Sequence, residues 1–476
     1  MLFNSPVYLF FLPVVFAIYW FVTGKSFKSQ NLVLIISSYV FYGWWDWRFT
    51  SLILLSTIVD YFCGLKIYHS RRRSEKTTTL FTSIIFNLSI LGYFKYCNFF
   101  IKSWVDLLSQ FGYEISNLWS LNIVLPVGIS FYTFQTMSYS LDIYYGKLKP
   151  TKDFISFATF VAFFPQLVAG PIERASNLLP QILSNRKFNY MQGVEGIRLI
   201  LWGMFKKVVI ADSLAWRVDY NFDNYATLDG GTLFLGLIYF SIQIYCDFSG
   251  YSDIAIGTAK LFGIELRSNF KYPYFSKSIG EFWRKWHISL SSWFRDYIYI
   301  PMGGSMNGKL KTIRNVFIVF TISGLWHGAN WTFIAWGFIN AIFYIPTFIL
   351  NKNVQLKVNY IDKSRGFHSF IKFYKILQTY LLITFTWVFF RSNSLLESIN
   401  YVSLMFSKFS LPSDNRGGVI LIAVFLIIEW GNRFDERNVL CYENVKLRRI
   451  VYFILFYLCF SFFKFYDFNH FIYFAF

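Results

Sequence analysis

The chain has 476 residues, of which 55% are hydrophobic and 15% are charged, whereas about a quarter of the residues in a soluble domain carry a charge. This composition excludes an ordinary soluble protein and predicts an integral membrane protein. The net charge of +19 does not indicate a nucleic-acid partner, because basic loops beside anionic membrane lipids account for it in a membrane protein.

Hydrophobic blocks recur along the whole chain, and they are continuous rather than alternating. A continuous block of roughly 20 residues spans a bilayer as a helix, which satisfies its own backbone hydrogen bonds in lipid. We therefore predict an all-α integral membrane protein with about eleven transmembrane helices, in which residues 1–476 form a single polytopic membrane domain. The predicted spans are residues 6–22, 31–46, 50–65, 79–101, 155–169, 193–212, 231–248, 315–350 (one or two spans), 373–390, 417–430 and 450–466, with further helical segments near 122–145 and 281–300.

The first block, MLFNSPVYLFFLPVVFAIYWFV, is predicted to be a transmembrane span rather than a cleaved signal peptide. It has no basic residue before the apolar run and no small-residue cleavage site. The loop 66–78 is rich in lysine and arginine, which places it in the cytoplasm. Counting back along the spans then puts the N-terminus on the extracytoplasmic side. The basic segments 352–375 and 433–449 also fit the cytoplasmic side.

Short and interrupted segments characterise the middle of the chain, between residues 102 and 315. The interruptions are LPVG, FFPQLVAGP and FKYPYF. Proline and glycine break helices, and broken helices at membrane depth occur where they line a buried cavity. We therefore expect a re-entrant, cavity-forming core. Asp247 and Asp253 lie in this part, where they either line a polar cavity or cap a broken helix.

Residues 281–300 combine charged and aromatic side chains, and Ser276 or Ser278 is expected to cap the start of a helix there. On a continuous helix one face would carry Phe282, Trp286, Trp293 and Tyr297. Another face would carry Arg284, His287, Ser291 and Arg295. Such an amphipathic helix is typical of the membrane interface. However, an interfacial helix has no need of a histidine.

His327 lies in a stretch, residues 315–350, that contains no Asp, Glu, Lys or Arg. An ionisable residue within a membrane is costly and indicates a functional site. Burial disfavours the imidazolium form, and a neutral imidazole is what a general base requires. Gly324 and Gly328 would let backbone or a ligand approach the ring closely, and Asn330 adds a polar group nearby. The alternative is a structural histidine hydrogen-bonded to a neighbouring helix.

Motifs of several other enzyme classes do not occur in the sequence. It has no GxxxxGK[ST] for nucleotides, no H-E-x-x-H for zinc and no G-x-S-x-G nucleophile elbow. The five cysteines are scattered without a C-x-x-C pair, so we expect neither a disulfide framework nor a metal site. Of the five histidines, only His287 and His327 have neighbouring residues that suggest a chemical role. For His327 the predicted chemistry is removal of a proton from a hydroxyl that attacks an activated carbonyl.

Two segments carry a family resemblance: FWRKWHISLSSWFRDYIYIPMGG, at residues 282–304, and GLWHGANWTFIAWG, at residues 324–337. They resemble the membrane-bound O-acyltransferase family and, within it, the bacterial alginate O-acetyltransferase branch. LPVGISFYTFQTMSYSLDIYYG, FFPQLVAGPIERA and YCDFSGYSDIAIG occur in the family's order. The resemblance covers residues 120–340, the expected catalytic core. It implies helices around a central tunnel, with the family's catalytic histidine at His327 and its second characteristic histidine at His287.

The resemblance further implies an enzyme that moves an acetyl or other short acyl group across the membrane, for O-acetylation of an exported, alginate-like polysaccharide. The expected donor is a cytoplasmic thioester, acetyl-coenzyme A or a phosphopantetheine acyl carrier, with no tightly bound cofactor. An SGNH-type extracytoplasmic partner is expected to complete the transfer, and the bacterial cytoplasmic membrane is the expected location. The residues predicted to position donor or substrate are Arg284, Trp283, Trp286, Trp326, Asn330 and Asp296.

Three alternatives stay open at this point. Within the family, the alternative is D-alanyl transfer to teichoic acids, although the IPMGG segment at residues 300–304 favours the acetyltransferase branch. A transporter or flippase for a lipid-linked glycan would explain the spans and broken helices, but not the two histidine motifs. A structural membrane scaffold would allow both histidines to be replaced.

Overall fold

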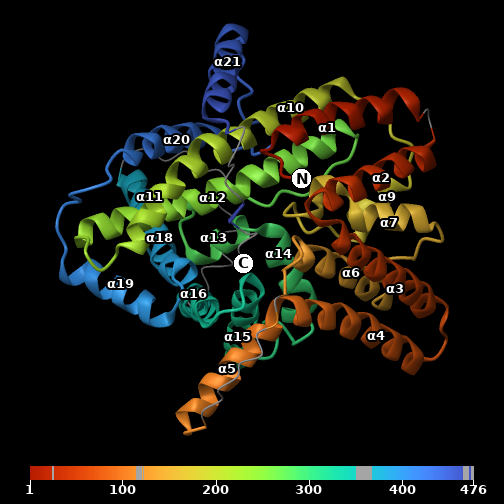
Figure 1. The fold of residues 1–476 in the computed structure, drawn as a ribbon, viewed down its shortest axis with the longest axis horizontal. Helices are drawn as coiled ribbons and strands as arrows, with labels where there is room; N and C mark the ends of the chain where they lie inside the picture. The colour runs from red at the N-terminus through yellow and green to blue at the C-terminus, as the bar shows by residue number, and fades with distance from the viewer. Residues whose placement is uncertain (24–25, 114–120, 122, 350–366, 465–470, 473–476) are drawn as a thin grey trace. The chain divides into compact units, whose positions relative to one another are not determined.

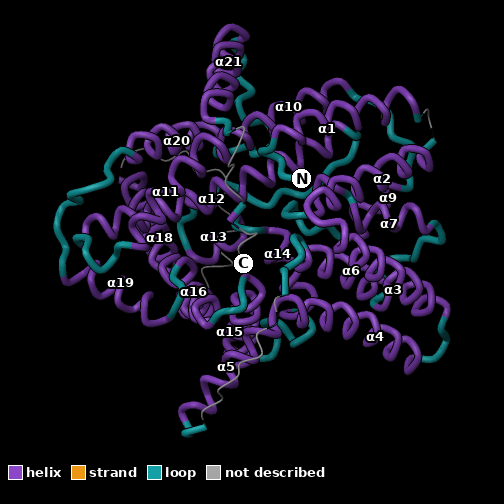
Figure 2. Tube along the Cα trace, viewed as in Figure 1, coloured by secondary structure: helices purple, strands orange, loops and turns teal. Residues whose placement is uncertain are grey.

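A computed structural model describes residues 1–23, 26–113, 121, 123–349, 367–464 and 471–472. Helices joined by loops make up these residues, and the described part of the chain contains no strand (Figure 2). The all-α prediction is therefore confirmed. The chain divides into two compact units, Met1–Ile197 with Ala255–Leu266, and Arg198–Ile254 with Arg267–Phe476. The assignment of residues 1–476 to one membrane domain stays a prediction.

The first unit consists mainly of the N-terminal helices. They are α1 (Pro6–Ala17), α2 (Phe27–Asp46), α3 (Thr50–His69), α4 (Arg73–Leu91), α5 (Cys97–Gln110), α6 (Ile129–Tyr144), α7 (Phe154–Ala162), α8 (Phe164–Leu167) and α9 (Ala175–Ile182). Local sequence fixes where the first of them starts. For α1, the Ser5 side chain accepts a hydrogen bond from the backbone N–H of Tyr8, and Pro6 occupies the first turn, where its missing N–H costs nothing.

A buried carboxylate joins three helices of the first unit. Asp60 on α3 is fully buried and accepts hydrogen bonds from Asn87 Nδ2 at 2.7 Å, from Ser140 Oγ at 2.8 Å and from Ser83 Oγ. The donors lie on α4 and α6, which both pack against α3 (Figure 1). Because buried polar groups must be hydrogen-bonded, this network holds α3, α4 and α6 in register.

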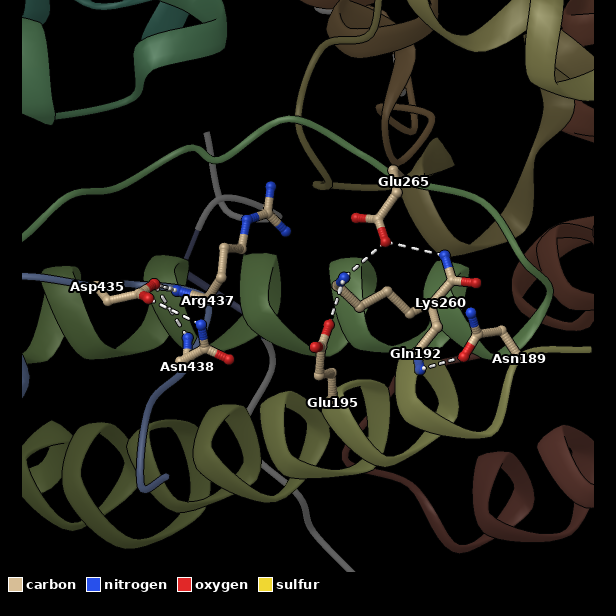
Figure 3. Close-up of polar contacts among 8 residues, drawn as sticks. All are labelled: Asn189, Gln192, Glu195, Lys260, Glu265, Asp435, Arg437 and Asn438. Atoms are coloured by element: carbon tan, nitrogen blue, oxygen red, sulfur yellow. Dashed lines mark hydrogen bonds and ion pairs between the residues drawn. The ribbon is translucent and has the colours of Figure 1, made fainter. Parts of the chain in front are cut away.

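Two helices, α10 (Tyr190–Met204) and α12 (Gly230–Leu261), contribute residues to both units. Within the first unit a methyl group at Gly196 would lie 2.6 Å from the carbonyl oxygen of Gly257, so the two backbones touch there. Beside this contact Lys260 bridges Glu195, at 3.1 Å, and Glu265, at 2.6 Å (Figure 3). The glycine contact and the Lys260–Glu195 ion pair together fix the crossing of α10 and α12.

The second unit contains the C-terminal half of the chain. A π-helical turn, η4 (Phe205–Ala211), continues α10 directly into α11 (Asp212–Asp223). The other helices are α13 (Ile279–Lys285), α14 (Ile288–Phe294), α15 (Lys309–His327), α16 (Trp331–Ile349), α18 (Phe367–Arg391), α19 (Leu395–Ser407), α20 (Gly418–Asn432) and α21 (Val445–Phe462). The turn after α20 is closed by Asp435, which accepts hydrogen bonds from the backbone N–H groups of Arg437 and Asn438 (Figure 3).

Several helical segments are long and apolar enough to cross a membrane. Among the described residues they are Phe27–His69, Arg73–Gln110, Gly230–Leu261, Trp331–Ile349 and Phe370–Arg391, with shorter apolar helices at Pro6–Val22 and Gly418–Asn432. A multi-pass membrane protein is thereby supported, and the number of about eleven crossings stays a prediction. The predicted span 315–350 consists of two helices, α15 and α16.

The predicted span at 155–169 is wrong. Helix α7 ends at Ala162, and Phe163 turns the chain with a ψ of 104°. The N–H of Phe164 donates to the Ser38 side chain at 3.0 Å instead of continuing the helix, and Pro165 opens the four-residue α8. Because proline carries no N–H, it favours a new helix start here over continuation of α7. The expectation of broken helices in the middle of the chain is confirmed at this point.

Candidate active site

The structure breaks the helix predicted over residues 281–300 at His287, so a continuous amphipathic helix is wrong. Helix α13 starts as expected, with the Ser278 side chain accepting a hydrogen bond from the N–H of Glu281 at 3.2 Å. Trp286 is extended, with φ −100° and ψ 128°. His287 is left-handed, with φ 43° and ψ 55°, a conformation that costs a non-glycine residue roughly 1–2 kcal/mol. Helix α14 and the π-helical turn η6 (Arg295–Tyr299) follow.

Main-chain contacts from a neighbouring segment explain this break. The N–H of Lys271 donates to the carbonyl oxygen of Lys285 at 3.0 Å, and the N–H of Ile288 donates to the carbonyl oxygen of Asn269 at 2.9 Å. The carbonyl of Lys285 and the N–H of Ile288 are therefore not available for the hydrogen bonds of a continuous helix through His287. Aromatic side chains predicted to share a face are separated as a result. Trp286 stacks on Phe282 and contacts Trp387, whereas Trp293 packs against Tyr297.

His287 lies in the protein interior, 1% exposed, which is incompatible with an interfacial helix. The ring of Phe248 contacts the imidazole edge-on at 4.6 Å between centroids, and the ring of Trp326 lies at 5.8 Å. Because burial removes water from the charged form, the pKa of His287 is lowered to about 3. His287 lies between two short helices outside the candidate membrane spans. It is neutral near pH 7 and is able to donate one N–H.

His327 is the last residue of α15, and it is 3% exposed. Three aromatic rings surround its imidazole, with centroids at 5.0 Å (Trp326), 5.1 Å (Trp336) and 5.3 Å (Phe390). The ring centroid of His287 lies 6.3 Å away. The two histidines, predicted from separate motifs, therefore meet in one apolar environment.

Glycines on α15 and α16 allow these two helices to approach closely. A methyl group at Gly324 would lie 2.2 Å from the carbonyl oxygen of Phe333, and one at Gly337 would lie 2.2 Å from that of Phe320. At Gly328 it would meet the Phe333 ring at 2.1 Å. The sequence predicted that the glycines beside His327 would admit backbone or a ligand. The neighbour that occupies this space is α16, so these glycines set the helix packing that places the histidine.

A cavity of about 330 Å³ lies beside both histidines. Its lining residues are Gly280, Trp283, Arg284, Trp286, His287, Ile288, Leu290, Ser291, Ser292, Phe294, Arg295, Tyr299, Ser305, Val316, Val319, Phe320, Ser323, His327, Tyr344 and Phe348. The lining is largely apolar with a few polar groups, as in most small-molecule sites. It combines two imidazoles, two guanidinium groups and several hydroxyls. Helices α13 to α16, which supply most of these residues, lie together in Figure 1.

The remaining residues predicted to position donor or substrate fall into two groups. Trp283, Trp286 and Arg284 line the cavity, and Trp326 contacts both histidine rings from outside this lining. The other two residues make structural contacts, and a role toward substrate stays a prediction for them. Asn330 accepts the N–H of Thr332 at the start of α16 and donates to the carbonyl oxygen of Asn393. Asp296 pairs with Arg295 at 2.7 Å.

Sequence reasoning missed three aromatic residues of the site. Trp336, Trp387 and Phe390 form a cluster, in which Trp336 stacks on Trp387 at 5.7 Å and meets Phe390 at 5.2 Å. Trp336 lies four residues before Asn340 on α16 and inside the second motif, so its place in that motif was an available signal. Trp387 and Phe390 come from α18, outside the motif region, and only tertiary packing identifies them.

A buried ionic cluster lies on α12 and η4, in the second unit. Lys206 pairs with Asp253, and Lys207 pairs with both Asp212 and Asp247, each at 2.7 Å between nitrogen and oxygen. Both lysines were overlooked in the sequence. Since α12 continues unbroken to Leu261, the alternative that Asp247 and Asp253 cap a broken helix is wrong. Their partners are the two lysines.

Comparison with known proteins gives matches over most of the chain. Residues 40–390 match the profile of MBOAT, the membrane-bound O-acyltransferase family. The chain is 40% identical over 437 residues to a protein of Pseudomonas syringae pv. tomato named "Probable alginate O-acetylase AlgI", an alignment that covers 90% of this chain and 80% of the relative. It is 35% identical over 435 residues to the peptidoglycan O-acetyltransferase of Helicobacter pylori, with 85% and 80% covered.

Similarity to the D-alanyl transfer proteins is more limited. The teichoic acid D-alanyltransferase of Bacillus subtilis is 30% identical over 234 residues, which covers 46% of this chain and 58% of that protein. The similarity to the O-acetyl transfer proteins is higher and extends over most of the chain.

Proposed function

The chain belongs to the membrane-bound O-acyltransferase family and is a multi-pass membrane O-acyltransferase, and we propose that it transfers acetyl groups for the O-acetylation of an exported polysaccharide. Relatives named for alginate and peptidoglycan O-acetylation support this acceptor class. The observation that carries the proposal is the meeting of His287 and His327 at one cavity, with 6.3 Å between ring centroids.

In the proposed reaction the two histidines have different tasks. His327 removes the proton of an acceptor hydroxyl as its oxygen attacks the thioester carbonyl carbon. The neutral imidazole of His287 donates its N–H to the oxyanion that develops on the carbonyl oxygen. When the carbon–sulfur bond breaks, the thiolate takes the proton held by His327, so an ester and a free thiol are formed. The buried surroundings of both rings exclude water, which would otherwise hydrolyse the thioester.

The thioester donor is proposed to be acetyl-coenzyme A or an acyl carrier with a phosphopantetheine arm. Support comes from Arg284 and Arg295, which line the cavity together with Ser291, Ser292 and Ser305. Guanidinium groups bind phosphate oxygens well. The apolar part of the lining, which includes Trp283 and Trp286, suits the acyl end of the donor.

The surroundings of the reaction are proposed from the loops and from the relatives. The basic loop 66–78 supports a cytoplasmic donor side and an extracytoplasmic N-terminus, in the proposed setting of a bacterial cytoplasmic membrane. An SGNH-type extracytoplasmic protein is the proposed partner, which receives the acetyl group from the ester formed at His327 and passes it to sugar hydroxyls. Because the polysaccharide lies on the opposite side of the membrane from the donor, the acetyl group must pass through the protein in this proposal.

The test is complementation of a strain from which the gene has been deleted. Wild-type protein is expected to restore the O-acetyl content of the exported polysaccharide, measured by alkaline release of acetate, and His327→Ala at equal membrane abundance is expected not to. Unchanged acetylation in the His327→Ala strain would overturn the proposal. Loss of D-alanine ester from teichoic acid would indicate D-alanyl transfer instead, and loss of polysaccharide export would indicate a transporter.

A further inference from the structure

The left-handed turn at His287 is held from one side by a single residue, Asn269. This residue follows α12 in the loop before α13, and it is 1% exposed. Its backbone carbonyl oxygen accepts the N–H of Ile288 at 2.9 Å, directly after the histidine. Its side-chain oxygen accepts the hydroxyl of Ser289 at 2.6 Å and the N–H of Ser289 at 3.4 Å. Asn269 therefore binds the first turn of α14 through three contacts.

The other end of the Asn269 side chain is anchored to a long helix. Its Nδ2 donates to the Ser252 hydroxyl on α12 at 3.2 Å, and Ser252 is also buried. The next residue, Phe270, packs edge-on against both Trp286, at 5.1 Å, and Phe248, at 5.0 Å. Phe248 in turn contacts the imidazole of His287. The Asn269 side chain and the Phe270 ring therefore connect the position of the His287 imidazole to helix α12.

We infer that Asn269 is a positioning residue that holds His287 in its left-handed conformation, so that the imidazole faces the cavity. A strained backbone persists only where its surroundings determine it. Here the determinants are the hydrogen bonds that Asn269 accepts from Ser289 and the one that it donates to Ser252. The inference rests on the proposed role of His287 as a hydrogen-bond donor to the reacting carbonyl. Asn269 does not line the cavity, so it acts on the reaction through His287.

The test compares Asn269→Ala in two backgrounds, wild type and His287→Ala, in purified protein with acetyl-coenzyme A as the donor probe. In the wild-type background we expect kcat for acetyl transfer to fall at least about 10-fold while KM for acetyl-coenzyme A changes by less than about 3-fold. The reason is that the misplaced His287 imidazole acts in the transition state. In the His287→Ala background we expect less than about a 2-fold further loss, since residues that act through one another are non-additive.

Two further variants keep the test independent of folding defects. Ser289→Ala removes one of the three contacts and is expected to give a smaller loss of kcat than Asn269→Ala. The matched control is Asn221→Ala, a fully buried asparagine on α11 outside the cavity lining, with an expected kcat within about 2-fold of wild type.

The outcomes separate this inference from the proposed function. A wild-type kcat in Asn269→Ala, or an equal fold-loss in both backgrounds, would overturn the positioning role. Full activity in His287→Ala would refute the role of His287 itself, whatever Asn269 does. Loss of activity in His287→Ala together with a normal Asn269→Ala would leave the proposed function standing and reject only the positioning role.

Discussion

The imidazole rings of His287 and His327 lie 6.3 Å apart between centroids, and both face the same cavity. One ring is held by a left-handed turn between two short helices, and the other ends a long helix. The two histidines lie on separate segments of the chain, so only tertiary packing brings their rings together. The two rings also differ in their proposed tasks, which substitutions are able to separate.

Substitutions at His287 test whether this residue acts as a hydrogen-bond donor or as a base. His287→Ala is expected to lower kcat by about 10²–10³-fold, the usual cost of losing one oxyanion donor. His287→Asn keeps an N–H donor, and Asn also tolerates the left-handed conformation, so we expect a much smaller loss. The measurement is kcat for acetyl transfer from acetyl-coenzyme A. Equal losses in the two variants would show that the imidazole does more than donate a hydrogen bond.

A methyl group at Gly324 is expected to impair both packing and activity. Gly324→Ala would place the new carbon 2.2 Å from the Phe333 carbonyl oxygen, so α15 and α16 must separate and His327 must move. We expect a lower unfolding temperature in detergent and at least about a 10-fold loss of kcat, because small misplacements of catalytic groups are costly. Gly431→Ala is the matched control, since nothing lies within 4 Å of the added methyl group there. Wild-type stability in Gly324→Ala would contradict the packing argument.

Removal of Lys207 is expected to destabilise the second unit strongly. The Lys207 side chain is 5% exposed and pairs with Asp247, whose side chain is 1% exposed. Leaving one buried charge without its partner costs about 3–5 kcal/mol, so Lys207→Ala should unfold at much lower temperature or fail to accumulate in the membrane. Asp219→Asn removes one side of the more exposed pair with Arg391 and should cost less than about 1 kcal/mol. Similar thermal stabilities for the two variants would refute this difference.

Acid is expected to destabilise the fold through His287. Burial lowers the pKa of His287 from 6.5 to about 3, so the unfolded chain binds a proton in a pH range where the folded protein does not. Its contribution to stability is therefore complete above pH 6.5 and is lost as the pH falls from 6.5 toward 3. Unfolding midpoints measured across this range should fall less steeply for His287→Asn than for wild type. Parallel slopes would show that His287 titrates normally.

Asn330 is expected to affect stability more than catalysis. Its side chain accepts the Thr332 N–H at the start of α16 and donates to the Asn393 carbonyl oxygen. Loss of an N-terminal helix cap costs about 1 kcal/mol. Asn330→Ala should therefore unfold at a slightly lower temperature with kcat within about 3-fold of wild type. A loss of kcat comparable to that of His287→Ala would instead place Asn330 in contact with the substrate.

Much of the site could be predicted from residues 282–304 and 324–337, because motif and chemistry coincide there. A histidine in a long stretch without charges indicated a buried imidazole, and the structure confirms its burial at His327. The role of that histidine stays a prediction. Periodicity failed at residues 281–300 because it assumes an unbroken helix. Backbone partners at Asn269 and Lys271 decide where that helix stops, and they are distant in sequence from His287.

The sequence by itself determined the class of protein, the family, the all-α fold and the two histidines, because hydrophobic blocks and motif residues are local properties of the chain. Only the tertiary structure decided how these parts act together. It placed α16 against Gly324, paired Asp247 with Lys207, and brought Trp387 against Trp336 and Phe390 against His327. Each of these contacts joins residues from different helices. Their geometry depends on close packing between helices, which no local pattern encodes.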